Sequence, residues 1–155
     1  MILLGIDPGK LGGIGILHPN GNAEVHKFTT EGDMRDIINA HVLDSYAYLE
    51  LVHSMPGDGN VSAFSFGENF GFYRGLLMAN LIPFEQVAPL KWQNFLKCRT
   101  HGDKNITKKK AQELYPRLKI THANADAILI ATYGQRMREQ FGKPNRGSNY
   151  YDFLA

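Results

Sequence analysis

The chain has 155 residues, of which 43% are hydrophobic and 21% are charged, and this is the composition of one ordinary soluble globular domain. Its net charge of +2 permits binding to nucleic acid but is too small to argue for it. The single cysteine, Cys98, excludes an internal disulfide and favours a reducing compartment. No stretch is long enough to span a bilayer and the N-terminus lacks the features of a signal peptide, so we expect a cytoplasmic protein without a membrane partner.

The beginning of the chain predicts an antiparallel meander of three strands. The first strand is an apolar run that ends in the carboxylate of Asp7, and Asn20-Gly21 marks a tight hairpin turn between the second and the third. The predicted strands cover residues 2–6, 12–17 and 23–28. Asp7-Pro8-Gly9 is also an ordinary turn sequence, so Asp7 alone does not indicate a functional site.

A helix is predicted over residues 31–42 and a buried strand over residues 45–52. Because the helix separates this strand from the hairpin, the strand should lie parallel to the first one, through a right-handed crossover. Asp7 and Glu50 would then both lie toward the carboxyl ends of neighbouring parallel strands, where open α/β sheets build their sites.

A long helix over residues 61–81 carries small residues at every fourth position, including Gly67, Gly71 and Gly75. This spacing places them on one face, although each glycine costs the helix about 1 kcal/mol. The face could allow close packing against the sheet of the same chain, or it could form the interface of a dimer.

The second half of the chain predicts a short strand, three further helices, a basic segment and a tail. The segment 97–110 is the only strongly basic one, and it is either a solvated surface or a track for a phosphate backbone. The predicted elements are a strand at 84–87, helices at 89–96, 107–114 and 124–140, and a C-terminal tail at 141–155 that follows a single domain at 1–140.

Asp7, Glu50 and Asp126 each stand alone in apolar surroundings. Uncompensated anions in a core cost several kcal/mol each, and a shared divalent cation would remove that cost. Carboxylate oxygens suit Mg²⁺ or Mn²⁺, and two such ions about 4 Å apart support phosphodiester hydrolysis. His122 lies four residues before Asp126 and is either a further ligand or a surface histidine at a helix start, while Asn124 is expected to be the N-cap of that helix.

Three segments of the sequence resemble the RuvC-type Holliday junction resolvases of the RNase H-like superfamily. They are Gly5-Ile6-Asp7-Pro8-Gly9, the strand that holds Glu50, and Ala125-Asp126-Ala127-Ile128. The resemblance covers residues 1–140, and the stretch from Leu49 to Gly57 with the Phe66-Gly67 helix after it is most similar to the phage branch. It implies an α/β fold with a mixed five-stranded sheet, an antiparallel meander plus parallel strands, flanked by helices.

The resemblance also implies a homodimeric Mg²⁺-dependent endonuclease that resolves four-way DNA junctions by paired nicks. By position, Asp7, Glu50 and Asp126 become ligands of two Mg²⁺ ions, which Mn²⁺ could replace, with no small-molecule cofactor. The family often has an acid where Ala123 stands, so His122 is the best substitute for the fourth ligand. The residues expected to bind DNA are Lys10, His53, Lys91, Lys97, Arg99, Lys104, Lys108 and Lys109, and those expected at the dimer interface are Gly67, Gly71 and Gly75.

Three other interpretations remain open at this point. The same carboxylates would serve an RNase H-like nuclease that acts on RNA or on other branched DNA. Sugar kinases and actin-like ATPases begin with a similar strand and turn, but those chains are far longer. A non-catalytic junction-binding module would explain the missing acid at Ala123.

Overall fold

The computed structural model describes residues 1–51 and 59–142. Its centre is a mixed five-stranded sheet in the order β3-β2-β1-β4-β5. The first three strands are antiparallel, and β4 and β5 continue the sheet in parallel with β1. The strands are β1 (Ile2–Asp7), β2 (Gly13–Leu17), β3 (Ala23–Lys27), β4 (Ser45–Glu50) and β5 (Phe84–Val87).

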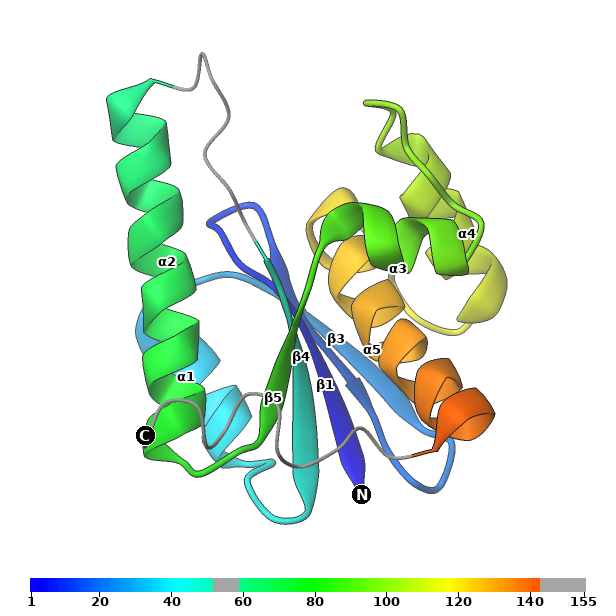
Figure 1. Ribbon diagram of the computed structural model, residues 1–155, viewed down its shortest axis with the longest axis horizontal. Coiled ribbons are helices and arrows are strands. Elements are labelled where there is room, and N and C mark those ends of the chain that lie inside the picture. The colour runs from blue at the N-terminus through cyan, green and yellow to red at the C-terminus, as the bar shows by residue number, and fades with distance from the viewer. Residues whose placement is uncertain (52–58, 143–155) are drawn as a thin grey trace.

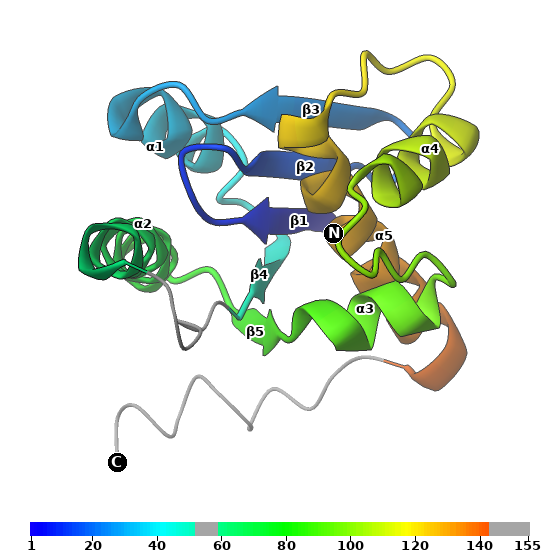
Figure 2. The ribbon, with the colours of Figure 1, turned by 90° about the horizontal axis from the view of Figure 1, so that it is seen from above.

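Helices cover both faces of the sheet, so that the molecule has three layers (Figures 1 and 2). Two helices lie on one face, where Met34, Ile38, Tyr73 and Leu77 pack on the sheet. The other three lie on the opposite face, around the buried Trp92. The first pair is α1 (Glu31–Asn39) and α2 (Asn60–Ala79), and the second group is α3 (Pro89–Phe95), α4 (Asn105–Leu114) and α5 (His122–Phe141).

The sheet topology and every strand expected from the sequence are confirmed. Two helices begin two residues earlier than the sequence predicts. Helix α4 begins at Asn105 and α5 at His122, in each case two residues before the expected position. The N-cap of α5 is Thr121 rather than Asn124, because the Asn124 side chain instead accepts a hydrogen bond from the Thr121 backbone in a reciprocal capping box.

Helix α1 ends at Asn39, three residues before its expected end, and α2 ends at Ala79 rather than at residue 81. The α2 helix therefore stops before Pro83 can interrupt it, with Asn80 capping its last carbonyl groups. The loop expected at 53–60 and the expected tail both fall largely outside the described residues.

Helix α5 lies directly on the backbone of β1 and β2. A Cβ atom at Gly5 would be 2.1 Å from the carbonyl oxygen of Ala127, and one at Gly15 would be 2.5 Å from Cα of Ile128. Both separations are impossible for real atoms, so only glycine permits this contact. The close approach matters because Asp126 is the neighbour of Ala127 on the same helix.

The small-residue face of α2 does not pack against the sheet of the same chain. A Cβ atom at Gly67, Gly71 or Gly75 would meet no other atom within 4 Å, while the large side chains of Tyr73 and Leu77 are the ones buried on the sheet. The explanation that these glycines pack against the sheet of the same chain is therefore wrong, and no part of the chain that the structure describes covers the glycine face of α2.

No helix in the described ranges is both long enough and apolar enough to cross a membrane.

The close contact between α5 and β2 predicts that substitutions at Gly15 destabilise the protein. We expect Gly15→Ala to lower the free energy of unfolding by at least about 2 kcal/mol, because even one methyl group must push the helix backbone away. Gly32→Ala is the matched control, since a Cβ there meets only Thr30 Oγ1 at 3.7 Å, and it should leave stability unchanged or raise it. Urea unfolding of both variants measures the difference, and equal stability would contradict the close contact.

Candidate active site

The carboxyl groups of Asp7 and Glu50 lie side by side at one end of the sheet. Ile6 of β1 pairs with Leu49 of the parallel strand β4. Asp7 and Glu50 are the next residues of these two strands, so they lie beside each other. They lie on the face that α5 covers, and they are close enough to share a hydrogen bond between their side chains. This confirms that the two acids meet at the carboxyl ends of neighbouring parallel strands.

Helix α5 brings the third acid, Asp126, to the same place. Its charge acts on both Asp7 and Glu50. Because α5 begins at His122, this histidine and Asp126 are one turn apart and lie on the same side of the helix. His122 is exposed, and its proximity favours the ionised form of Asp126. The three acids thus lie near one another at one end of the sheet and His122 lies near Asp126, but no three of these four residues have ligand atoms that all lie within 4.8 Å of one another.

Three further side chains surround the acids. The indole N–H of Trp92 donates a hydrogen bond of 2.8 Å to Oε1 of Glu50, which is only 9% exposed. The hydroxyl of Thr107 is within hydrogen-bonding reach of Asp126. Lys104 lies near enough for its positive charge to favour the ionised forms of all three acids. These contacts fix the carboxyl groups in position but do not neutralise them.

Burial raises the pKa values of all three acids, and repulsion from neighbouring acids adds to the shift of Asp7 and Glu50. The pKa of Asp7 lies well above its ordinary value, first because of burial and then because of the charges of Glu50 and Asp126. Burial raises the pKa of Glu50 to about 7, against the hydrogen bond from Trp92. Burial also raises the pKa of Asp126, although Thr107, Lys104 and His122 oppose that shift. The protein therefore holds these groups where ionisation is unfavourable unless a cation is added.

The donor set fits a divalent cation. Oδ1 of Asp126 is fully buried and has no hydrogen-bond partner among the described residues, which is costly for a carboxylate oxygen. Hard oxygen donors from Asp7, Glu50 and Asp126 match the preferences of Mg²⁺ and Mn²⁺. A cation bound between them would supply the missing partner and remove the repulsion.

A pocket of about 370 Å³ gives access to Asp7 from outside. Its walls are the turn after β1, the first turns of α2 and the side chain of Lys104. The amide of Gly9 donates a hydrogen bond of 2.6 Å to Oδ1 of Asn69, which is buried in the middle of α2. This bond ties the turn after Asp7 to the helix, so that α2 forms one wall of the site.

The basic residues expected to bind DNA differ in their surroundings. Lys104 lines the pocket of Asp7, and so does Lys10, which follows the turn after β1. Lys91 Nζ lies 3.6 Å from a carboxylate oxygen of Glu85, so it is already part of an ion pair. His53 lies outside the described residues. The remaining four are Lys97 and Arg99, which are exposed on the segment after α3, and Lys108 and Lys109, which lie on α4.

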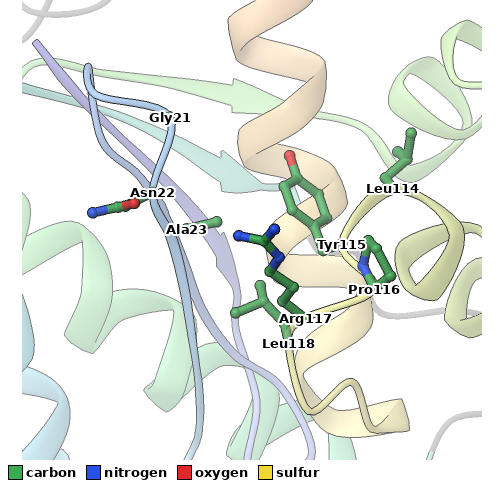
Figure 3. Close-up of a pocket in the computed structure, with 8 residues that line it drawn as sticks. All are labelled: Gly21, Asn22, Ala23, Leu114, Tyr115, Pro116, Arg117 and Leu118. Carbon is green, nitrogen blue, oxygen red and sulfur yellow. The ribbon is translucent and has the colours of Figure 1, made fainter.

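A second pocket, of about 310 Å³, lies at the far end of the β2–β3 hairpin (Figure 3). The turn residues Gly21 to Ala23 form one side, and the segment from Leu114 to Leu118 forms the other. It contains no acidic residue and none of the residues indicated by the sequence. It therefore does not compete with the carboxylate site as the candidate active site.

Solved structures with the same arrangement of elements identify the fold. A structure of RuvC from Thermus thermophilus matches with a TM-score of 0.59 at 20% identity, covering 90% of this chain and 96% of RuvC. A second one, of T. thermophilus RuvC in complex with a Holliday junction substrate, matches with a TM-score of 0.61 at 18% identity, covering 92% and 98%. The chain has the RuvC fold. The expected α/β architecture with a mixed five-stranded sheet is thereby confirmed.

One curated protein is similar in sequence. It is the chloroplastic Holliday junction resolvase MOC1 of Chlamydomonas reinhardtii, which is 30% identical over 94 residues. The match covers 57% of this chain but only 11% of the much longer relative. No model of a protein family matches the chain.

Three residues of the site, Trp92, Asn69 and Thr107, were not singled out from the sequence. Trp92 was expected only to fill the core, yet a buried indole N–H requires an acceptor, and that general rule could have pointed to a neighbouring acid. Asn69 is an amide followed and preceded within one turn by Phe66, Phe70 and Phe72, and an amide beside so many aromatic residues could have indicated a buried side chain with a specific partner. The identity of each partner, however, depends on residues far away in the chain.

The raised pKa values predict an unusual pH dependence. Groups whose pKa is higher in the folded than in the unfolded state stabilise the fold fully below the unfolded value, and this contribution is lost as pH rises through the folded value. Without divalent cations, we therefore expect the free energy of unfolding to fall between about pH 4 and pH 7.

In the same cation-free protein at pH 7, Asp7→Asn should raise the free energy of unfolding by about 1 to 3 kcal/mol. Mg²⁺ should stabilise the wild type but not this variant. The control Glu113→Gln removes an exposed carboxylate of α4 and should change neither result. Thermal unfolding measures all four combinations, and an Asp7→Asn protein less stable than wild type without metal would contradict the argument.

Proposed function

We propose that this protein is a metal-dependent endonuclease that resolves four-way DNA junctions by paired nicks. The observation that carries the proposal is the convergence of Asp7, Glu50 and Asp126 at the strand ends of a RuvC fold, with a buried carboxylate oxygen that has no hydrogen-bond partner in the described part of the chain. The similar proteins support the substrate class, since one solved RuvC structure holds a Holliday junction and MOC1 is named as a Holliday junction resolvase.

In this proposal the three acids and His122 hold two Mg²⁺ ions, and Mn²⁺ can replace them. The bound cations would supply an activated water and charge stabilisation for the leaving oxygen, which is the usual chemistry of two-metal phosphodiester hydrolysis. Asp7 lies within hydrogen-bonding reach of Glu50 and within range of the charge of Asp126, so it would help to hold both ions. Trp92 orients Glu50 through its hydrogen bond, and Thr107 does the same for Asp126.

The substrate phosphate would enter through the pocket that opens on Asp7. Lys10 and Lys104 line that pocket and would contact the phosphate on either side of the cut. The exposed residues Lys97, Arg99 and Lys109 would extend the contact along the DNA backbone. Lys91 could join them only after leaving its ion pair with Glu85.

Paired nicks require two active sites, and the open face of α2 is the surface that we propose for a homodimer. Gly67, Gly71 and Gly75 lie on it in a row, and a Cβ atom at any of them would have no neighbour within 4 Å among residues 1–51 and 59–142. Large apolar side chains are exposed at both ends of the row, with Phe64 69% and Met78 40% exposed. Such a strip would let two α2 helices approach closely while burying apolar surface. For a phage-encoded protein, this function would operate in the cytoplasm of the bacterial host.

The function is tested by a cleavage assay that compares a synthetic four-way junction, a flap, a duplex and an RNA–DNA hybrid, each with and without Mg²⁺. We expect the junction to be cut in the presence of Mg²⁺ only. Asp7→Asn should lower the cleavage rate by at least about 1000-fold and leave junction binding intact, because it removes a ligand and not a phosphate contact.

Glu113→Gln is again the matched control and should cut at the wild-type rate. Preferential cleavage of the flap or of the hybrid would contradict the proposed substrate and indicate a nuclease for that nucleic acid. Tight junction binding with no cleavage by any metal would indicate a non-catalytic junction-binding module.

The dimer is tested by light scattering at micromolar protein concentration. We expect a dimer that Gly71→Leu converts to monomer, because the new side chain holds the two helices apart. Gln112→Leu adds the same side chain to an exposed position of α4 and should leave the dimer intact. A wild-type monomer, or a dimer that survives Gly71→Leu, would show that this face is not the interface.

A further inference from the structure

A second group of metal-ligating side chains lies at the opposite end of the sheet from the carboxylate site. His18 follows β2, Glu24 belongs to β3, and His41 follows the end of α1. One ligand atom from each lies within 4.8 Å of those from the other two, and all three residues are partly buried. None of them belongs to the proposed active site.

The register of the sheet separates the two sites clearly. Leu17 pairs with Leu3, whereas Gly13 pairs with Asp7, so His18 lies level with the start of β1, at the other end of that strand. At about 3.3 Å per residue, the separation along the strands is on the order of 15 Å. Glu24 and His26 also lie on the face that α1 covers, since the alternate residues Ala23 and Val25 pack on the α5 side.

The distances within this group are close to those of a coordination site. Nε2 of His18 lies 2.6 Å from Oε1 of Glu24, and Nε2 of His41 lies 4.0 Å from the same oxygen. Ligand atoms around a tetrahedral Zn²⁺ ion are about 3.3 Å apart, a value that these two distances bracket. Rotations of the side chains alone would therefore suffice to admit an ion.

His41 is already held in the tautomer that a metal requires. Its Nδ1 lies 2.7 Å from the carbonyl oxygen of Ile37, and because a carbonyl can only accept, Nδ1 must carry the proton. When the ring is neutral, Nε2 therefore presents a lone pair toward Glu24. A ring nitrogen fixed by a backbone carbonyl in this way is the usual support of a metal-binding histidine.

Glu24 is held in place on its other side. Nε2 of His26 lies 3.3 Å from Oε2 of Glu24, which leaves Oε1 directed at His18 and His41. Burial raises the pKa of Glu24, but the hydrogen bonds from His18 and His26 outweigh it and lower that pKa below its ordinary value. The carboxylate is thus ionised and oriented, as a ligand must be.

We propose that His18, Glu24 and His41 form a binding site for Zn²⁺ or a similar divalent transition ion, with water in the remaining position. Two imidazoles and one carboxylate suit such an ion, whereas Mg²⁺ prefers oxygen ligands only. His26 acts as a positioning residue for Glu24. Because the ligands come from β2, β3 and the end of α1, the ion joins the edge of the sheet to that helix and stabilises the fold. This site does not depend on the proposed nuclease function.

The test is a calorimetric titration of the full chain with Zn²⁺ in the presence of excess Mg²⁺, which occupies the carboxylate site without competing for imidazole. We expect one Zn²⁺ to bind to each chain, and His41→Ala to weaken it by at least about 100-fold, the upper end of what the loss of a supporting group costs. His101→Asn is the matched control, since it removes an exposed histidine of another loop at a positive φ that asparagine tolerates.

Glu24→Gln provides a second variant that keeps the size of the side chain and an acceptor for His18 but loses the anionic ligand. It should also weaken Zn²⁺ binding, and Zn²⁺ should raise the melting temperature of the wild type but of neither site variant. Co²⁺ bound to the wild type should show the strong visible absorption of a tetrahedral site. Equal Zn²⁺ affinity in the wild type and both site variants, or no binding to the wild type, would overturn the proposal.

Discussion

The position of α5 on the sheet is the constraint on which the rest of this molecule depends. The helix can approach β1 and β2 only because Gly5 and Gly15 have no side chains. That approach carries Asp126 to the ends of β1 and β4, where Asp7 and Glu50 already lie. A larger residue at either glycine would separate the third acid from the other two. The geometry of the site therefore depends directly on the packing of the core.

The site holds its acids in fixed orientations, in surroundings where their negative charges are unfavourable. Trp92 and Thr107 fix the orientation of Glu50 and Asp126, while burial disfavours the ionisation of both and the charge of Asp126 adds to this for Glu50. A protein that only needed to fold would gain stability by replacing these acids with apolar residues. Their presence at strand ends, beside a pocket that opens on Asp7, is what favours a role in binding cations and phosphates.

Two other features of the molecule lie outside the carboxylate site: the outer face of α2 and the group of His18, Glu24 and His41. Helix α2 forms a wall of the site on its buried side through Asn69, and its opposite face presents the open row of glycines. A partner on that face would therefore act on the active site through one helix. The histidine group at the other end of the sheet is independent of both, because it lies on the α1 side and level with the start of β1.

The sequence by itself determined the strand pattern, the parallel crossover and the identity of Asp7, Glu50 and Asp126 as unusual acids, because these depend on local periodicity and on charge within apolar runs. Tertiary structure alone decided what each group faces. The glycines of α2 face away from the sheet and contact no other described element, Trp92 meets Glu50, and His18 and His41 meet at Glu24. These contacts join residues that are distant in the chain, and no local pattern encodes a partner that only folding brings near.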